Sequence, residues 1–173
     1  NMRDSVDMRI GRQKAERRRS GVLTAGALIL IAALGRPPVA QAAEEVDLEL
    51  VLAVDISFSV DLFEAQTQRD GYIVALTHPS VIAAIQSGML GKIAVTYLEW
   101  SDAYYQSQLV QWTVISDEAS ARSFAATLAA KPLNRAYYTS ISHAVDFAAG
   151  LFDSNDYTGM RKVIDISGDG YNN

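Results

Sequence analysis

The stretch LVLAVDISFSVDLF, Leu50–Phe63, joins an apolar run to a row of small oxygen-bearing side chains. The run belongs to a Val- and Leu-rich segment, 46–55, which is typical of a strand buried on both faces of a parallel sheet. Asp55, Ser57 and Ser59 then follow at every second position. In an extended chain such positions point the same way, so their three side chains would face one point beyond the end of the strand.

Two interpretations of this spacing are open. One carboxylate and two hydroxyls form a hard, oxygen-only donor set, which suits Mg²⁺ or Mn²⁺. Alternatively, Ser57 and Ser59 cap the helix that follows, and Asp61 favours the dipole of that helix. The rest of the chain has to decide between a metal site and a helix cap.

The chain after residue 42 alternates between strand and helix patterns and has no internal repeat. A short turn separates the second strand from the third, which favours antiparallel pairing of these two. The alternation otherwise predicts a doubly wound, Rossmann-like α/β fold, with a mainly parallel sheet, one antiparallel edge strand and helices on both faces. We expect strands at 46–55, 91–100, 107–115 and 161–167, helices at 60–76, 78–88, 116–130 and 139–153, and loops at 131–138 and 154–160.

Residues 1–42 have the pattern of a secretory signal peptide. The charged segment GRQKAERRRS is followed by the apolar segment GVLTAGALILIAALG and by a small-x-small cleavage site at 40–42. An uncleaved membrane anchor is the alternative, but the apolar segment is short for a span of about 20 residues. We therefore expect cleavage after Ala42, a mature domain at 43–173 with no stable membrane span, and a periplasmic or secreted bacterial protein, exported by the general or the twin-arginine route.

Charge is distributed unevenly along the chain, whose formal net charge is −5. Residues 1–42 hold 8 Lys and Arg against 3 Asp and Glu, whereas residues 43–173 hold 7 against 17, so the two balances are +5 and −10. An acidic domain of this kind argues against nucleic acid as a partner and favours a hard cation. The sequence has no Cys, which excludes disulfides, thiolate metal sites and thiol nucleophiles.

Three segments place oxygen-bearing side chains where an open α/β sheet binds ligands, beyond the carboxyl ends of its strands. DISFS follows the first strand, SGDG with Asp169 follows the fourth, and YYTSIS with Thr139 leads into the last helix. In this order they resemble the metal-ion-dependent adhesion site of the von Willebrand factor A superfamily. More narrowly, VDLELVLAVDISFSVD, IAVTYLEWS, TSISHAVDFAAGLFD and RKVIDISGDGYNN are similar to a family of exported bacterial proteins within that superfamily, known only as a domain of unknown function.

The resemblance implies a role for each matching residue. Ser57 and Ser59 would coordinate Mg²⁺ directly, or Mn²⁺ or Ca²⁺ in its place, and Thr139 would coordinate it directly or through water. Asp55 and Asp169 would mostly hold coordinating waters. One position would stay open for a carboxylate from a protein partner, because a cation with few bound carboxylates keeps its electrophilic character. The resemblance therefore implies a non-enzymatic interaction module.

Two other functions stay open. A metal-dependent hydrolase would use a water on the same ion, although the sequence offers no general base near the motifs and no Gly-x-Ser-x-Gly elbow. The second alternative is a structural domain whose metal site is degenerate and empty. Phe58 stands where the narrower family tends to have a small residue, so its ring would line or crowd the site.

The superfamily fold normally continues for two more strands with helices, whereas this sequence stops soon after Asp169. We therefore expect a domain that is truncated after its fourth strand. Strand 161–167 would then lack a neighbour on one side and present an apolar edge. For this reason we expect the 43–173 form to dimerise or aggregate.

Overall fold

The computed structural model describes residues 42–168, which belong to one unit of the chain spanning 40–173. The predicted signal peptide up to residue 41 and the predicted site residue Asp169 lie outside the described residues. None of the described helices has the length and hydropathy that crossing a bilayer requires. The described elements are β1 (Glu44–Val46), β2 (Leu48–Asp55), α1 (Leu62–Thr77), α2 (Pro79–Gln86), β3 (Ile93–Trp100), β4 (Gln106–Ile115), α3 (Glu118–Ala129), α4 (Ile141–Leu151), β5 (Tyr157–Gly159) and β6 (Lys162–Ser167).

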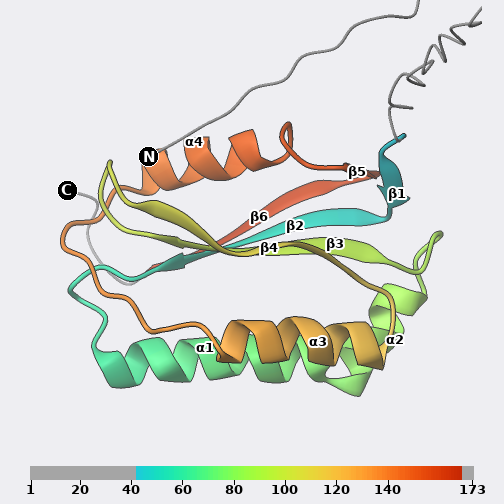
Figure 1. Ribbon diagram of the computed structural model, residues 1–173, viewed down its shortest axis with the longest axis horizontal. Coiled ribbons are helices and arrows are strands. Elements are labelled where there is room, and N and C mark those ends of the chain that lie inside the picture. The colour runs from blue at the N-terminus through green and yellow to red at the C-terminus, as the bar shows by residue number, and fades with distance from the viewer. Residues whose placement is uncertain (1–41, 169–173) are drawn as a thin grey trace, which may run out of the picture. The chain divides into compact units, whose positions relative to one another are not determined.

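The central sheet contains four strands in the order β4-β3-β2-β6 (Figure 1). β2 runs parallel to both of its neighbours, and its last residue, Asp55, lies opposite Trp100 of β3. β4 pairs with β3 in the antiparallel direction and forms one edge. Every residue of β3 and most of β2 are buried, as expected for central strands covered on both faces. The mainly parallel sheet with one antiparallel edge strand confirms the predicted fold class.

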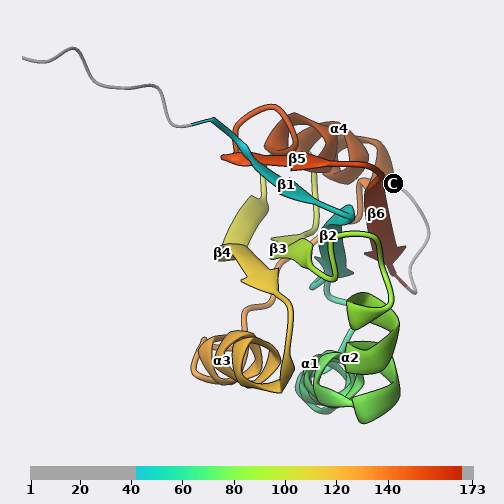
Figure 2. The ribbon, with the colours of Figure 1, turned by 90° about the vertical axis from the view of Figure 1, so that its right-hand side faces the viewer.

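Helices cover both faces of this sheet (Figures 1 and 2). α1, α2 and α3 lie on one face, and α4 lies on the other. Side chains of β2 alternate between the two cores: Leu52 and Val54 belong to the core beside α1–α3, and Val51 and Ala53 to the core beside α4. This arrangement confirms the predicted doubly wound architecture.

A second, two-stranded parallel sheet of β1 and β5 differs from the prediction. The predicted strand 46–55 is divided between β1 and β2, and the predicted loop 154–160 contains β5. The buried carboxylate of Glu49 fixes this junction, because it accepts hydrogen bonds from the Gly159 N–H at 2.7 Å and from the Asn155 amide at 2.8 Å. Strands of three residues are too short to show a periodicity, so the sequence pattern does not reveal them.

The start of α1 tests the helix-cap interpretation of the serine spacing. Asp61 is the N-cap of this helix, and its carboxylate accepts hydrogen bonds from the N–H groups of Phe63 at 2.7 Å and Glu64 at 2.8 Å. The Glu64 carboxylate in turn accepts the Asp61 N–H at 2.8 Å, which completes a capping box. The interpretation of Ser57 and Ser59 as the caps of this helix is therefore wrong.

Candidate functional site

Asp55 is the last residue of β2 and is fully buried. Its Oδ1 accepts a hydrogen bond of 2.7 Å from the N–H of Ser57, which is also buried. The neighbouring strand β3 fixes the backbone directly after Asp55, because the Ile56 N–H donates to the Trp100 carbonyl at 2.9 Å. The Asp55 carboxylate is thus held at the carboxyl ends of the parallel strands, where open α/β sheets bind ligands.

Ser57 and Ser59 come together through a turn. The chain leaves the extended conformation after Asp55, and the Val60 N–H donates to the Ser57 carbonyl at 3.0 Å. The Oγ atoms of Ser57 and Ser59 lie 3.0 Å apart, whereas residues two apart in an extended strand are separated by about 6.6 Å. The prediction that an extended chain aligns these residues is wrong, but the two hydroxyls do meet.

Thr139 is buried in a loop beside this turn. α4 starts two residues later than predicted, so Thr139 stays outside the helix. The loop is fastened on both sides of Thr139, because the Ala136 N–H donates to the Ile56 carbonyl at 2.9 Å and the Ser140 N–H donates to the Ser101 carbonyl at 2.7 Å. The structure therefore brings the threonine loop to the strand ends that carry the two serines.

Asp169, the fifth predicted site residue, lies outside the described residues. Its neighbour Gly168 follows β6 and comes close to Asp55 and Trp100. A Cβ atom at position 168 would lie 3.0 Å from Asp55 Oδ2 and 3.3 Å from the Trp100 ring. Since a side chain there would crowd the carboxylate, glycine allows β6 to end directly beside Asp55.

The donors at these strand ends suit a hard divalent cation such as Mg²⁺, Mn²⁺ or Ca²⁺. Ser57, Ser59 and Thr139 supply hydroxyl oxygens, and Asp55 supplies one carboxylate. Within residues 42–168, no group of three or more His, Cys, Asp or Glu side chains is arranged to hold a metal ion. The hydroxyl and carboxylate oxygens of the described residues are thus the donor types that such a cation takes.

An arginine and two aromatic rings form the exposed side of the site. Arg135 donates from Nε to the Val60 carbonyl and from Nη2 to the Phe58 carbonyl, both at 3.1 Å. Its guanidinium carbon lies 4.7 Å from the centre of the Phe58 ring, which stacks on Tyr137 with ring centres 5.5 Å apart. Phe58 is 61% exposed, so its ring lines the rim of the site. The sequence gives no signal for Arg135, because these contacts join residues more than 70 positions apart.

A buried ion pair fixes the beginning of the same loop. Arg69 of α1 donates from Nη2 to Oε1 of Glu99 at 2.7 Å, and both side chains are buried. Arg69 also donates to the carbonyls of Lys131 at 2.6 Å and Pro132 at 3.0 Å, while the Asn134 amide donates to Oε2 of Glu99 at 2.8 Å. Charge-assisted hydrogen bonds therefore attach the threonine loop to α1 and β3.

Comparison with known proteins gives the family. A model for the family described as "Protein of unknown function (DUF1194)" matches residues 45–173. The chain belongs to the DUF1194 family. This result confirms the predicted membership of an uncharacterised family. Comparison with curated proteins finds no significant match.

Solved structures similar to this DUF1194 domain include a von Willebrand factor (vWF) domain, of the superfamily that the three motifs resemble. The vWF domain of the type V pili tip protein Mfa5 from Porphyromonas gingivalis aligns with a TM-score of 0.48 and 14% sequence identity. The alignment covers 73% of the DUF1194 chain and 39% of that chain. A structure of three N-terminal domains of Mfa5 aligns with a TM-score of 0.44 and 13% identity, over 69% of this chain and 19% of that one.

A pocket of about 290 Å³ opens beside the candidate site of the DUF1194 domain. It lies between the start of α1 and the end of β6, where the Gln68 amide donates to Ser167 Oγ at 2.9 Å. Its lining residues are Val60, Glu64, Gln68, Ser167 and Gly168. The pocket adjoins the serine turn through Val60, so there is open space beside the candidate site.

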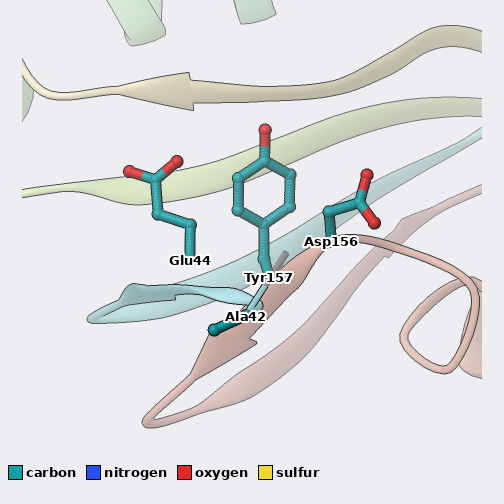
Figure 3. Close-up of a pocket in the computed structure, with 4 residues that line it drawn as sticks. All are labelled: Ala42, Glu44, Asp156 and Tyr157. Atoms are coloured by element: carbon teal, nitrogen blue, oxygen red, sulfur yellow. The ribbon is translucent and has the colours of Figure 1, made fainter. Parts of the chain in front are cut away.

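Another pocket, of about 260 Å³, lies at the β1–β5 sheet (Figure 3). It is lined by Ala42, Glu44, Asp156 and Tyr157. Burial, followed by the nearby carboxylates of Glu44 and Asp156, raises the pKa of Tyr157. Because β1 leads into the start of β2, this pocket lies at the opposite end of β2 from Asp55 and contains no predicted site residue.

Proposed function

We propose that this domain is an exported interaction module that binds a divalent cation, Mg²⁺ in the first place, and a protein partner through that cation. The observation that supports the proposal is the meeting of two loops at the carboxyl end of β2. The Ser57 and Ser59 hydroxyls lie 3.0 Å apart beside the buried Asp55, and the loop of Thr139 is hydrogen-bonded to the same strand ends.

The proposed site divides its residues between direct and indirect contacts. Ser57 and Ser59 would hold the cation directly, Thr139 would hold it directly or through water, and Asp55 and Asp169 would hold coordinating waters. A bound Mg²⁺ would supply an electrophilic centre for a carboxylate of the partner. The backbone bond from Ser57 to Asp55 keeps the Asp55 carboxylate oriented before any cation arrives.

Titration calorimetry with MgCl₂ on the 43–173 chain tests the metal part of the proposal. We expect heat of binding in the wild type and its loss in Asp55→Ala and Ser57→Ala. Asp153→Ala and Ser123→Ala are matched controls, because both side chains are exposed and lie outside the two site loops, Ser123 on α3 and Asp153 in the turn after α4, and they should bind as the wild type does. Unchanged binding in both site variants would contradict the proposal.

Two further measurements test the other parts of the proposal, its non-enzymatic character and its export. Turnover of phosphoester or peptide substrates that requires Asp55 would replace the module with a hydrolase. Recovery of a chain that begins at Ala43 from the periplasm or the medium would support export. Retention of the 1–42 segment on a membrane would contradict the predicted cleavage.

A further inference from the structure

Three large aromatic side chains gather on the rim of the candidate site. Phe58, Tyr137 and Tyr138 are 61%, 67% and 68% exposed. Single exposed apolar residues are ordinary on protein surfaces, but a contiguous group marks an interaction surface more often. Aromatic residues and Arg are also enriched at the centres of protein interfaces. The group lies on the two loops that form the proposed metal site, so a partner bound there would meet it.

This aromatic surface is ordered before any partner binds. The rings of Phe58 and Tyr137 stack with only 10° between their planes, and the Arg135 guanidinium lies over the Phe58 ring. Arg135 is itself fixed by its hydrogen bonds to two carbonyls of the serine turn. Since these side chains are already held, the domain loses less conformational entropy when a partner packs against them.

The backbone of Tyr138 is strained at the same place. Its φ is +49°, and it is the one non-glycine residue within 42–168 with a positive φ. A bulky side chain rarely adopts this conformation, and it persists only where the surrounding structure imposes it. Here the hydrogen bonds of Ala136 and Ser140 hold the loop on both sides. Strain of this kind concentrates at functional sites, which is a second observation that points to the aromatic surface.

The charge of Arg135 indicates the chemistry of the partner. The domain has a balance of −10 over residues 43–173, so this cation on the rim stands out from an acidic background. Its bonds to the Val60 and Phe58 carbonyls use two of the five guanidinium N–H donors, and the side chain is exposed, so other donors can pair with an acidic group from outside. A partner with more than one acidic group fits this arrangement better than a neutral one.

We infer that Phe58, Tyr137 and Arg135 form a specificity surface for an acidic protein segment that carries an aromatic residue two positions from the metal-bound carboxylate. In an extended segment, residues two apart point to the same side, so the carboxylate and the aromatic ring would both face the domain. The carboxylate goes to the cation, and the aromatic ring packs against the Phe58–Tyr137 stack. The inference rests on the proposed function, because the cation fixes where the carboxylate binds.

An array of immobilised twelve-residue peptides tests the inference. Each peptide carries one Asp for the cation and one further Asp for Arg135, and the residue two positions before or after the first Asp is Phe, Tyr, Ala or Lys. The wild-type 43–173 chain in MgCl₂ should bind the aromatic peptides roughly three- to tenfold better than the alanine peptides, as expected for one added aromatic contact. Phe58→Ala and Tyr137→Ala should lose this preference and keep Mg²⁺ binding by calorimetry. Tyr157→Ala, a tyrosine at the opposite end of β2, is the matched control and should keep both.

The outcomes separate this inference from the proposed metal site. Mg²⁺-dependent binding of all Asp peptides without an aromatic preference would overturn the specificity surface and leave the metal site standing. An aromatic preference that survives EDTA and Ser57→Ala would overturn the metal site, and with it the spacing from a metal-bound carboxylate, and would leave only the aromatic contact of Phe58 and Tyr137. Binding of immobilised neutral glycans, lost in Phe58→Ala and Tyr137→Ala, would replace the acidic segment with a carbohydrate. The absence of any binding by the folded wild type would overturn both.

Discussion

The buried carboxylate of Glu99 has a donor at each oxygen, the Arg69 guanidinium and the Asn134 amide. Removal of its charge would leave the buried Arg69 guanidinium without a counter-charge, which costs about 3–5 kcal/mol in other proteins. We therefore expect Glu99→Gln to lower the free energy of unfolding by about 3 kcal/mol or more. Urea denaturation followed by circular dichroism measures this loss.

An exposed ion pair on α3 gives the control for this prediction. Glu118 and Arg122 form a pair one helical turn apart, and both side chains are mostly exposed. Such a pair contributes less than about 1 kcal/mol, so Glu118→Gln should change stability little. Equal losses in the two variants would contradict the argument that burial makes the Glu99 pair important.

Asp47 lies between β1 and β2, and its side chain binds the backbone of the segment that precedes β3. Its carboxylate accepts hydrogen bonds from the N–H groups of Leu90 at 2.9 Å and Lys92 at 3.2 Å. These backbone bonds, that of Leu90 above all, lower the pKa of Asp47 below its usual value of 3.8. In the unfolded chain the group therefore takes up a proton at a higher pH than in the folded chain.

The lowered pKa of Asp47 predicts a dependence of stability on pH. The stabilisation by Asp47 is complete above its usual pKa of 3.8, and it is lost as the pH falls below 3.8 through the folded-state pKa. We expect wild type to melt at a higher temperature than Asp47→Asn near neutral pH, and the difference to shrink as the pH falls to about 2. Thermal melts across this range measure the effect, and a constant difference would contradict it.

Elements differ in how far the sequence predicts them. β2 and β3 are long apolar runs, so their pattern predicts the centre of the sheet and the position of Asp55 at a strand end. β1 and β5 have three residues each and depend on the distant carboxylate of Glu49, so no local pattern reveals them. At the site, the spacing of Ser57 and Ser59 predicts that their hydroxyls face one point, and the two hydroxyls do meet, although through a turn and not an extended chain.

At the scale of the whole molecule, β6 forms the edge of the central sheet opposite β4. It pairs with β2 on one side, and no other strand within 42–168 pairs with it. Ile166 on this strand is 37% exposed. An apolar edge with unpaired backbone groups is a template for another chain, so the structure gives a physical reason for the predicted self-association.

We expect the 43–173 chain to self-associate through β6 and Ile166→Lys to shift it towards the monomer, because Lys on an edge strand opposes pairing with another chain. Sedimentation velocity over a range of protein concentrations measures the distribution. Val74→Lys is the matched control, since Val74 is an exposed apolar residue on a helix and has no strand edge to offer, and it should leave self-association unchanged. A wild type that sediments as a monomer at every concentration would contradict the role of this edge. An equal effect of the two lysine variants would show that added surface charge, and not the β6 edge, controls self-association.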